Sequence, residues 1–193
     1  MGMAVEIAGP LYLAVCYLIG NVMTGYLVAK LLKGVDLRKE GSGNIGARNA
    51  GRVLGKAGFV LTLGGDAAKG ALAVLVAEYL DLSSTFQLLG FLAVLVGHCW
   101  PAVLKFHGGK GVAAFIGGIL IIDYKAALVM AAIFLLLFAI KRSLTAAGLV
   151  SFGLYPIIFY LMGGGLLEVL LLIPSSLLVV WVQKEELRER MVL

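Results

Sequence analysis

Seven long apolar runs constrain the fold of this chain more than any other feature of its sequence. A helix of about 20 residues crosses the hydrocarbon core of a bilayer, and in lipid a helix satisfies its own backbone hydrogen bonds. The runs are continuous rather than alternating, which argues against a β-barrel. The sequence therefore predicts an all-α, polytopic membrane protein with about seven transmembrane helices, forming one domain over residues 1–193. The runs cover residues 4–32, 50–79, 83–100, 110–122, 124–140, 144–162 and 165–183.

Composition supports the membrane interpretation. The chain is 61% hydrophobic and 14% charged, with a mean hydropathy of +1.02. Soluble domains are rarely so apolar, because a small globule has to cover a large surface with polar groups. Cys16 and Cys99 both lie in apolar runs and suit neither a disulfide framework nor a zinc site. We expect no metal, no cofactor and no nucleic-acid partner.

Two of the runs are irregular. The fourth is short, and is either a half-span or a segment that continues into the fifth past Asp123. The second begins with Arg52 and Lys56, so its first turns are expected at the membrane interface.

Basic residues gather on one side of the predicted bundle. With seven spans, every lysine and arginine falls on that side except Lys125 and Lys69, the latter inside the second run. The positive-inside rule places this side in the cytoplasm, with the N-terminus outside and the C-terminus inside.

Two glycine-rich loops share the basic side. They read GSGNIGARNAGRVLGK, from Gly41 to Lys56, and FHGGKGVAAFIGG, from Phe106 to Gly118. Glycine lets backbone N–H groups approach a ligand, and each loop leads into a helix N-terminus, which attracts anions. Neither loop is a Walker A motif, since GGKG lacks the following Ser or Thr and no strand precedes it. With Arg48, Arg52 and Lys110 they predict binding of phosphate or another oxyanion. For Gly117 and Gly118 we expect helix packing instead.

Three polar residues within the apolar runs allow two interpretations each. Asp66 and Lys69 share one helical face, so the pair is either structural or supplies charge to the anion site. His98 either satisfies a structural need at a helix end or takes part in the site between the two loops. His107, beside GGK, is the only other histidine.

The motifs GSGNIGA, D..KG and GH..P....F.GGKGVA, in this order, resemble those of the bacterial acyl-phosphate-dependent glycerol-3-phosphate acyltransferases of the PlsY type. The resemblance covers residues 17 to about 118, and the seven-span topology agrees with it. It implies transfer of an acyl chain from acyl-phosphate to the 1-hydroxyl of glycerol 3-phosphate, giving lysophosphatidate in phospholipid synthesis. It also implies a bacterial inner-membrane enzyme with its active site at the cytoplasmic face.

Residue roles follow from the resemblance as hypotheses. Ser42 and nearby backbone N–H groups hold a phosphate or the oxyanion, Arg52 and Lys110 bind phosphate, and His98 orients the loops or a substrate hydroxyl. The candidate catalytic residues are Ser42, His98 and His107. The candidate substrate-binding residues are Gly41, Gly43, Asn44, Asn49, Arg52, Lys69, Gly108, Gly109, Lys110 and Gly111.

The sequence departs from the family pattern at the end of the last apolar run. Where the family carries a cluster like RHREN, this chain reads VQKEE, with Gln183 at the histidine position and Glu186 at the asparagine position. His107 stands where the family commonly has lysine, and Arg48 where it has threonine. The missing histidine leaves the acceptor phosphate or His107 as the base.

Two other functions remain open. One is a non-catalytic relative that binds or moves an anionic lipid or phosphate metabolite, which the altered third motif favours. The other is a small-solute transporter, which the absence of a clear internal repeat disfavours.

Overall fold

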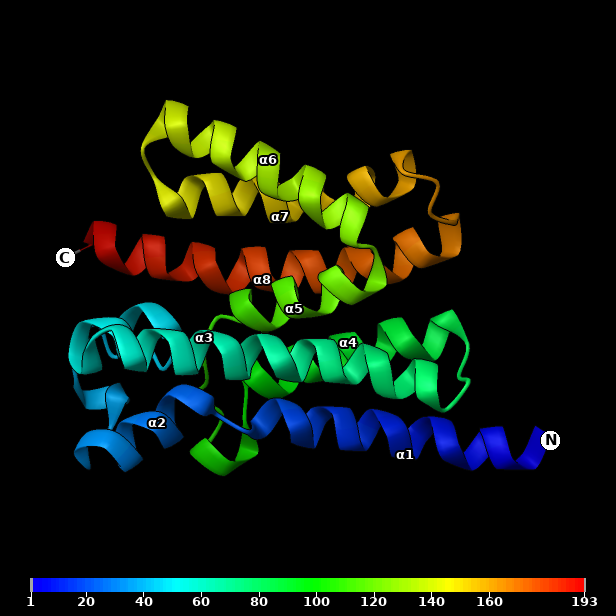
Figure 1. Ribbon diagram of the computed structural model, residues 1–193, viewed down its shortest axis with the longest axis horizontal. Helices are drawn as coiled ribbons and strands as arrows, with labels where there is room; N and C mark the ends of the chain where they lie inside the picture. Colours follow the sequence, from blue (N-terminus) through cyan, green and yellow to red (C-terminus); the bar gives the residue numbers. More distant parts are fainter. Residues whose placement is uncertain (1, 193) are drawn as a thin grey trace.

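In the computed structural model of the protein, which describes the backbone of residues 2–192 and the side chains of residues 9–183, all regular secondary structure is helical. Six helical segments are long and apolar enough to cross a membrane, and α5 is a shorter apolar helix. Together they account for all seven predicted runs, which confirms the multi-pass all-α fold. In chain order the elements are α1 (Gly2–Asn21), α2 (Thr24–Lys33), η1 (Leu37–Lys39), α3 (Ala47–Tyr79), α4 (Ser84–Cys99), η2 (Ala102–Leu104), α5 (Val112–Ile122), α6 (Tyr124–Lys141), α7 (Leu144–Leu161) and α8 (Leu166–Val192) (Figure 1).

The first predicted run is broken into two helices. Residues 22–23, between α1 and α2, are not helical. The ammonium group of Lys69, from α3, donates to the carbonyls of Gly20 (3.1 Å) and Val22 (2.9 Å) at this break. Carbonyls that lose their helical partners in apolar surroundings need another donor. The break therefore depends on a side chain from a different helix.

The fourth run is a half-span. Helix α5 has 11 residues. Its length is therefore about 16 Å, against a hydrocarbon core of about 30 Å. It does not continue into α6, because the chain is extended at Asp123 (φ −158°). The Asp123 carboxylate then caps α6 by accepting from the backbone N–H groups of Lys125 (2.8 Å) and Ala126 (3.0 Å).

The second run forms the longest of the apolar helices. Helix α3 has 33 residues. Its length of about 50 Å exceeds the thickness of the hydrocarbon core. Its axis is interrupted at Gly55 (φ 77°, ψ −164°), and Arg52 and Lys56 lie on either side of this point. That the first turns of α3 lie at the membrane interface stays a prediction.

Glycines allow the closest helix contacts. A Cβ at Gly70 or Gly117 would overlap the backbone of the facing helix across the α3–α5 contact. The same holds for Gly20 and Gly97 across the α1–α4 contact. Small residues serve this purpose in membranes because lipid provides no hydrophobic drive for association, so helices depend on close packing. The packing role expected for Gly117 is confirmed.

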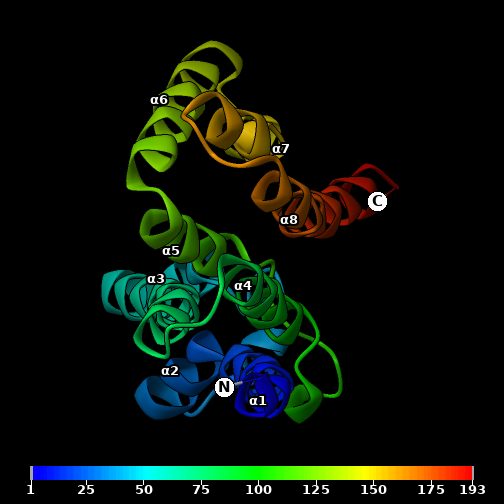
Figure 2. The same cartoon turned by 90° about the vertical axis from the view of Figure 1, so that its right-hand side faces the viewer.

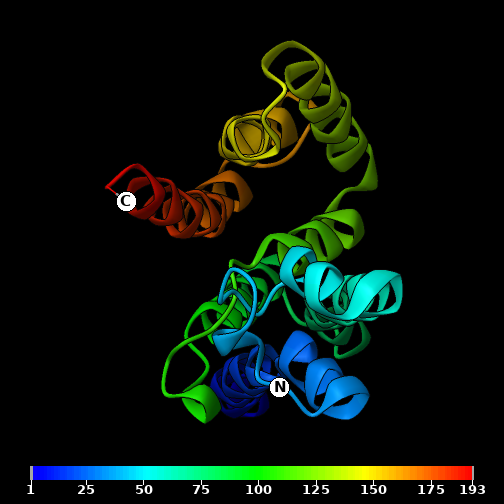
Figure 3. The ribbon, with the colours of Figure 1, turned by 90° about the vertical axis from the view of Figure 1, so that its left-hand side faces the viewer.

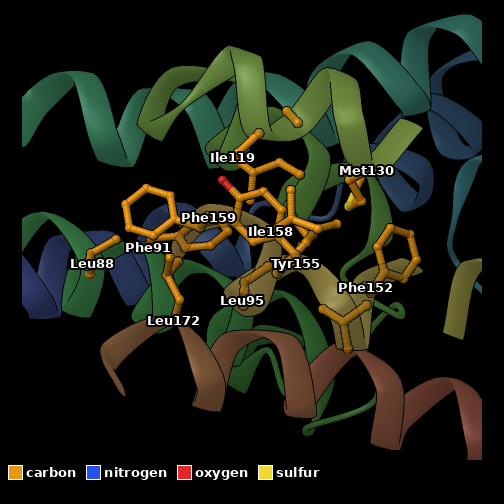
Figure 4. Packing of buried hydrophobic residues seen from close by; sticks show 14 of the residues in the cluster. Leu88, Phe91, Leu95, Ile119, Met130, Phe152, Tyr155, Ile158, Phe159 and Leu172 are labelled. Atoms are coloured by element: carbon orange, nitrogen blue, oxygen red, sulfur yellow. The ribbon is translucent and has the colours of Figure 1, made fainter. Parts of the chain in front are cut away.

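The half-span α5 joins two groups of helices. Seen end-on, α1 to α4 form one group and α6 to α8 the other, with α5 between them (Figures 2 and 3). Phe115 of α5 is fully buried, and its ring centroid lies 5.6 Å from that of Phe91 and 5.8 Å from that of Tyr155. Phe152 and Phe159 extend the same cluster (Figure 4). The apolar core thus links α4, α5 and α7.

The basic junctions lie together at one end of the molecule. The α2–α3 connection, the α6–α7 turn and the C-terminal end of α8 occupy the end opposite to the start of α1 (Figure 1). Both glycine loops belong to this end, because one precedes α3 and the other follows α4.

The orientation of this end stays a prediction. A reporter that works only in the cytoplasm is expected to be active when it is fused after Leu193 and inactive when it is inserted beside Asp81. The reason is that lysine and arginine near membrane spans are retained on the cytoplasmic side. Reporter activities in the opposite sense would place both glycine loops outside the cell.

Candidate functional site

The first glycine loop is folded around one side chain, Asn49. Its amide nitrogen donates to the carbonyls of Glu40 (2.9 Å) and Asn44 (2.8 Å), and its oxygen accepts from the backbone N–H of Ser42 (2.9 Å). Asn49 is 1% exposed. Gly41 has a φ of +59°, and a Cβ there would collide with the Asn49 amide. The loop therefore requires glycine at 41 and asparagine at 49 for its shape.

This folding uses N–H groups that were expected to face a ligand. The Ser42 N–H is committed to Asn49, and the Gly43 N–H donates to the Glu40 carbonyl (3.0 Å). The Gly46 N–H donates to the side chain of Asn44 (2.9 Å). In this conformation Ser42 therefore has its hydroxyl but not its N–H available to a ligand, and its role in holding a phosphate or the oxyanion stays a prediction.

Asp36 fixes the entry to the loop. Its carboxylate accepts from the backbone N–H of Arg38 (3.0 Å) and pairs with the Arg38 guanidinium (2.7 Å). Hydrogen bonding to that guanidinium lowers the pKa of Asp36 from 3.8 to about 2. The carboxylate favours the folded loop above pH 3.8, and this contribution is lost as the pH falls toward 2. The entry keeps its ion pair at neutral pH.

The second glycine loop folds back over the end of α4. The Gly109 N–H donates to the His98 carbonyl (3.0 Å), and the His98 ring packs directly against Gly109. A Cβ at Gly108 would meet the carbonyls of His98 and Cys99. Gly111 has a φ of +74° and begins α5. These glycines permit the close approach that sets Lys110 at the start of the half-span.

A buried polar cluster lies beneath the two loops. Asp66 Oδ1 is 3.1 Å from Lys69 Nζ and 3.7 Å from His98 Nδ1, and all three residues are at most 5% exposed. The three N–H groups of Lys69 face three acceptors, namely Asp66 and the carbonyls of Gly20 and Val22. Of the two roles left open for Lys69, this arrangement supports the structural one.

One cavity of about 540 Å³ lies above this cluster. The first turns of α3, α5 and α7 reach it, as do α6 and the end of the described part of α8. Its polar lining includes Ser42, Asn44, Arg48, Asn49, Arg52, Asp66, His98, Lys110, Thr145 and Gln183. Its apolar lining includes Phe59, Leu63, Ile116, Ile119, Leu120, Leu128, Met130, Phe134 and Phe152.

The lining changes character along the helices. On α3, Arg48 and Arg52 precede Phe59 and Leu63, and on α5 the basic start at Lys110 gives way to isoleucine and leucine. Helices that start at free N–H groups add positive potential at the polar end. The cavity thus offers an anion site that continues into a space suited to a hydrocarbon chain.

The cavity brings together part of the predicted set. The predicted residues that line it are Ser42, Asn44, Asn49, Arg52, His98, Lys110 and Gly111. Those that do not line it are Gly41, Gly43, Lys69, His107, Gly108 and Gly109. His107 is exposed, and its Nδ1 lies 2.7 Å from the Lys105 carbonyl. The predicted glycines that do not line the cavity, Gly41, Gly43, Gly108 and Gly109, shape the two loops instead.

Arg48, which was expected to add to the anion site with Arg52 and Lys110, lines the cavity one helical turn before Arg52. Other lining residues were not singled out from the sequence. Thr145 follows the α6–α7 turn and had no motif around it. The apolar residues of α6 and α7 had no signal, since lipid-facing and cavity-facing positions are equally apolar. Gln183 lines the cavity and is 6% exposed, whereas the side chains of Lys184 and Glu186 lie outside the described residues.

Known proteins are similar to this chain in sequence and in fold. The profile of the family Glycerol-3-phosphate acyltransferase matches residues 10–192. Glycerol-3-phosphate acyltransferase 1 of Bacillus cereus is 44% identical over 175 residues, which are 91% of this chain and 96% of that protein. The protein of the same name from Desulfitobacterium hafniense is 47% identical over 146 residues, 76% of this chain and 72% of that protein. The crystal structure of PlsY, an integral membrane glycerol 3-phosphate acyltransferase in its glycerol 3-phosphate form, superposes with a TM-score of 0.86. It is 30% identical, and the match covers 96% of this chain and 92% of that one.

Proposed function

The chain belongs to the glycerol-3-phosphate acyltransferase family, and we propose that it transfers an acyl chain from acyl-phosphate to the 1-hydroxyl of glycerol 3-phosphate, releasing lysophosphatidate. The observation that carries this proposal is one cavity, reached by both glycine loops, that has a cationic end and an apolar end. Acyl-phosphate combines an anion with a hydrocarbon chain, and the acceptor brings a second phosphate. The protein spans the membrane several times, and we place its site at the cytoplasmic face of a bacterial inner membrane.

The proposed substrate needs little chemical activation. Acyl-phosphate is a mixed anhydride, so the acceptor oxygen attacks its carbonyl carbon, a C–O ester bond forms, and inorganic phosphate leaves. Arg52 and Lys110 hold phosphate oxygens, and the Ser42 hydroxyl donates to the charge that develops on the carbonyl oxygen. Positioning and preorganised donors of this kind lower the barrier without a covalent enzyme intermediate.

The proton of the attacking hydroxyl needs an acceptor. Gln183 lines the cavity, but a neutral amide does not take a proton. His107 is exposed and lies outside the cavity lining. A phosphate monoester has a second pKa near 6 and is largely a dianion at neutral pH. We therefore assign the base to a substrate phosphate rather than to His107.

His98 acts in this proposal through the second glycine loop. Its carbonyl binds the Gly109 N–H, and its ring supports the same residue from below. The ring nitrogen Nδ1 lies 3.7 Å from Asp66 Oδ1. His98 thus positions Lys110 rather than contacting the acceptor hydroxyl.

The assay that tests this function uses purified protein with acyl-phosphate and glycerol 3-phosphate. We expect lysophosphatidate by mass spectrometry, and no more than a trace with acyl-CoA or acyl-carrier-protein donors run alongside. A preference for either thioester donor would contradict the proposed donor. If no donor yields product while the protein still binds lipid phosphate, the chain is a binding or transport relative.

A further inference from the structure

A second hollow, of about 520 Å³, lies along the first turns of α3. All of its lining residues belong to α3, so it occupies a face that no other described helix covers. Three cations line it, Arg48, Arg52 and Lys56, and the side chains of Phe59 and Val60 close one end. We call this hollow the α3 groove.

Two glycines create the groove. Gly51 and Gly55 lie four residues apart and contribute no side chains to its floor. At Gly55 the backbone adopts φ 77° and ψ −164°, and a Cβ there would meet nothing within 4 Å. This combination of angles is essentially restricted to glycine. The break in α3 therefore leaves open space between the cations.

The cations of the groove have no anionic partner in the described structure. Arg48 and Arg52 lie one helical turn apart on one face of α3, and Lys56, just beyond the break at Gly55, lines the same hollow. No carboxylate lines the groove, and none among residues 9–183 forms an ion pair with these three residues. Like charges at this spacing destabilise a helix, and a bound anion would relieve the repulsion.

The apolar end of the groove indicates what kind of anion fits. Phe59 is 38% and Val60 62% exposed, directly beyond the cations. Along α3 the groove thus runs from the cations near the start of the helix to exposed apolar side chains farther along it. This order matches a lipid molecule in the leaflet, with its phosphate at the headgroup level and its chains below.

We propose that the α3 groove binds the phosphate of an anionic membrane lipid, with the acyl chain of that lipid lying against Phe59 and Val60. This site goes beyond the proposed function, because it lies outside the reaction cavity and requires no turnover. Arg48, Arg52 and Phe59 line both spaces, so the bound lipid sits beside the mouth of the cavity. A lipid phosphate in the groove therefore competes with substrate phosphate for two of the same cations.

Lys56 lines the groove but not the cavity, which makes Lys56→Gln the selective test. Native mass spectrometry of the purified protein would measure binding of phosphatidate and, separately, of phosphatidylcholine. We expect wild type to prefer phosphatidate and Lys56→Gln to bind it about fivefold more weakly, the usual contribution of one cation near an anionic lipid. Lys56→Arg is expected to keep the affinity. Lys39→Gln, which removes a cation on the same side but outside the groove, is the matched control.

Equal phosphatidate binding by Lys56→Gln and Lys39→Gln would overturn the proposal. So would displacement of bound phosphatidate by an equal concentration of glycerol 3-phosphate, which would indicate a site for free phosphate esters. If Lys56→Gln is not monodisperse, Val60→Asp, which puts a carboxylate at the apolar end, is expected to weaken binding instead. Acyl transfer measured on the same samples separates the two proposals: lost lipid binding with retained transfer supports the groove, and absent transfer in wild type counts only against the proposed function.

Discussion

Replacing Arg52 by alanine is expected to lower kcat/KM for acyl transfer to glycerol 3-phosphate by about tenfold or more. Charge-assisted hydrogen bonds contribute roughly 1.5–3 kcal/mol, and about 1.4 kcal/mol corresponds to a factor of ten. Arg52 lines the polar end of the cavity and forms no ion pair within the described side chains, so its charge is available to a ligand. Initial rates at varied concentrations of both substrates would give the change.

Three further variants show whether that loss comes from the charge of Arg52. Arg52→Lys keeps the charge but not the two-pronged geometry, so its activity is expected to fall between wild type and Arg52→Ala. Lys110→Ala removes another cation of the polar end and is expected to lose a similar factor. Lys39→Ala removes an exposed cation that does not line the cavity and is expected to leave the rate unchanged. Wild-type rates in Arg52→Ala and Lys110→Ala, both monodisperse, would remove these residues from the site.

Replacing Asp66 by alanine is expected to destabilise the fold by about 3–5 kcal/mol, because it leaves the Lys69 ammonium buried without a counter-charge. Both partners are at most 5% exposed. An unpaired charge among membrane helices is costly. For a chain of this size the loss corresponds to a fall of roughly 10 °C in Tm. Thermal unfolding in one detergent, followed by size-exclusion chromatography, would measure it.

A double variant distinguishes the charge from the packing. Asp66→Leu with Lys69→Met removes both charges and keeps the apolar volume, so it is expected to be more stable than Asp66→Ala. The recovery is expected to be incomplete, because the carbonyls of Gly20 and Val22 then lose their donor. If Asp66→Ala and the double variant unfold at the wild-type temperature, the cluster does not stabilise the break between α1 and α2.

The number and placement of the helices followed from local properties of the chain. Each apolar run became helical, because a backbone in lipid has to make its own hydrogen bonds. The exception is the break in the first run, whose carbonyls are satisfied by Lys69 of α3. The short run 110–122 became a half-span for the same local reason, since Gly111 starts α5 and Asp123 caps α6. The two glycine loops were also recognisable, and the structure places both beside one cavity.

Roles within the site were less accessible, and Asn49 and Lys69 show why. Both were expected to bind substrate. The amide of Asn49 is fully engaged by the backbone of the loop that folds around it. The ammonium of Lys69 faces Asp66 and donates to the carbonyls of Gly20 and Val22, at the break between α1 and α2. A polar side chain within an apolar segment indicates that it makes some interaction, but the sequence does not show with which residue. Partners that lie 47 and 49 residues away along the chain are set only by packing.

The sequence by itself determined that this protein is a bundle of membrane helices with glycine-rich, cationic loops at one end, because hydropathy and charge act on each segment separately. Only the tertiary structure decided which apolar residues line the cavity, such as Met130, Phe134 and Phe152. In a soluble helix the period of the apolar residues separates the buried face from the solvent face. In a membrane helix the lipid-facing and the interior positions are both apolar, so the period is lost. The face that each helix turns to the substrate is therefore fixed by contacts between helices, through the glycines of α3 and α5.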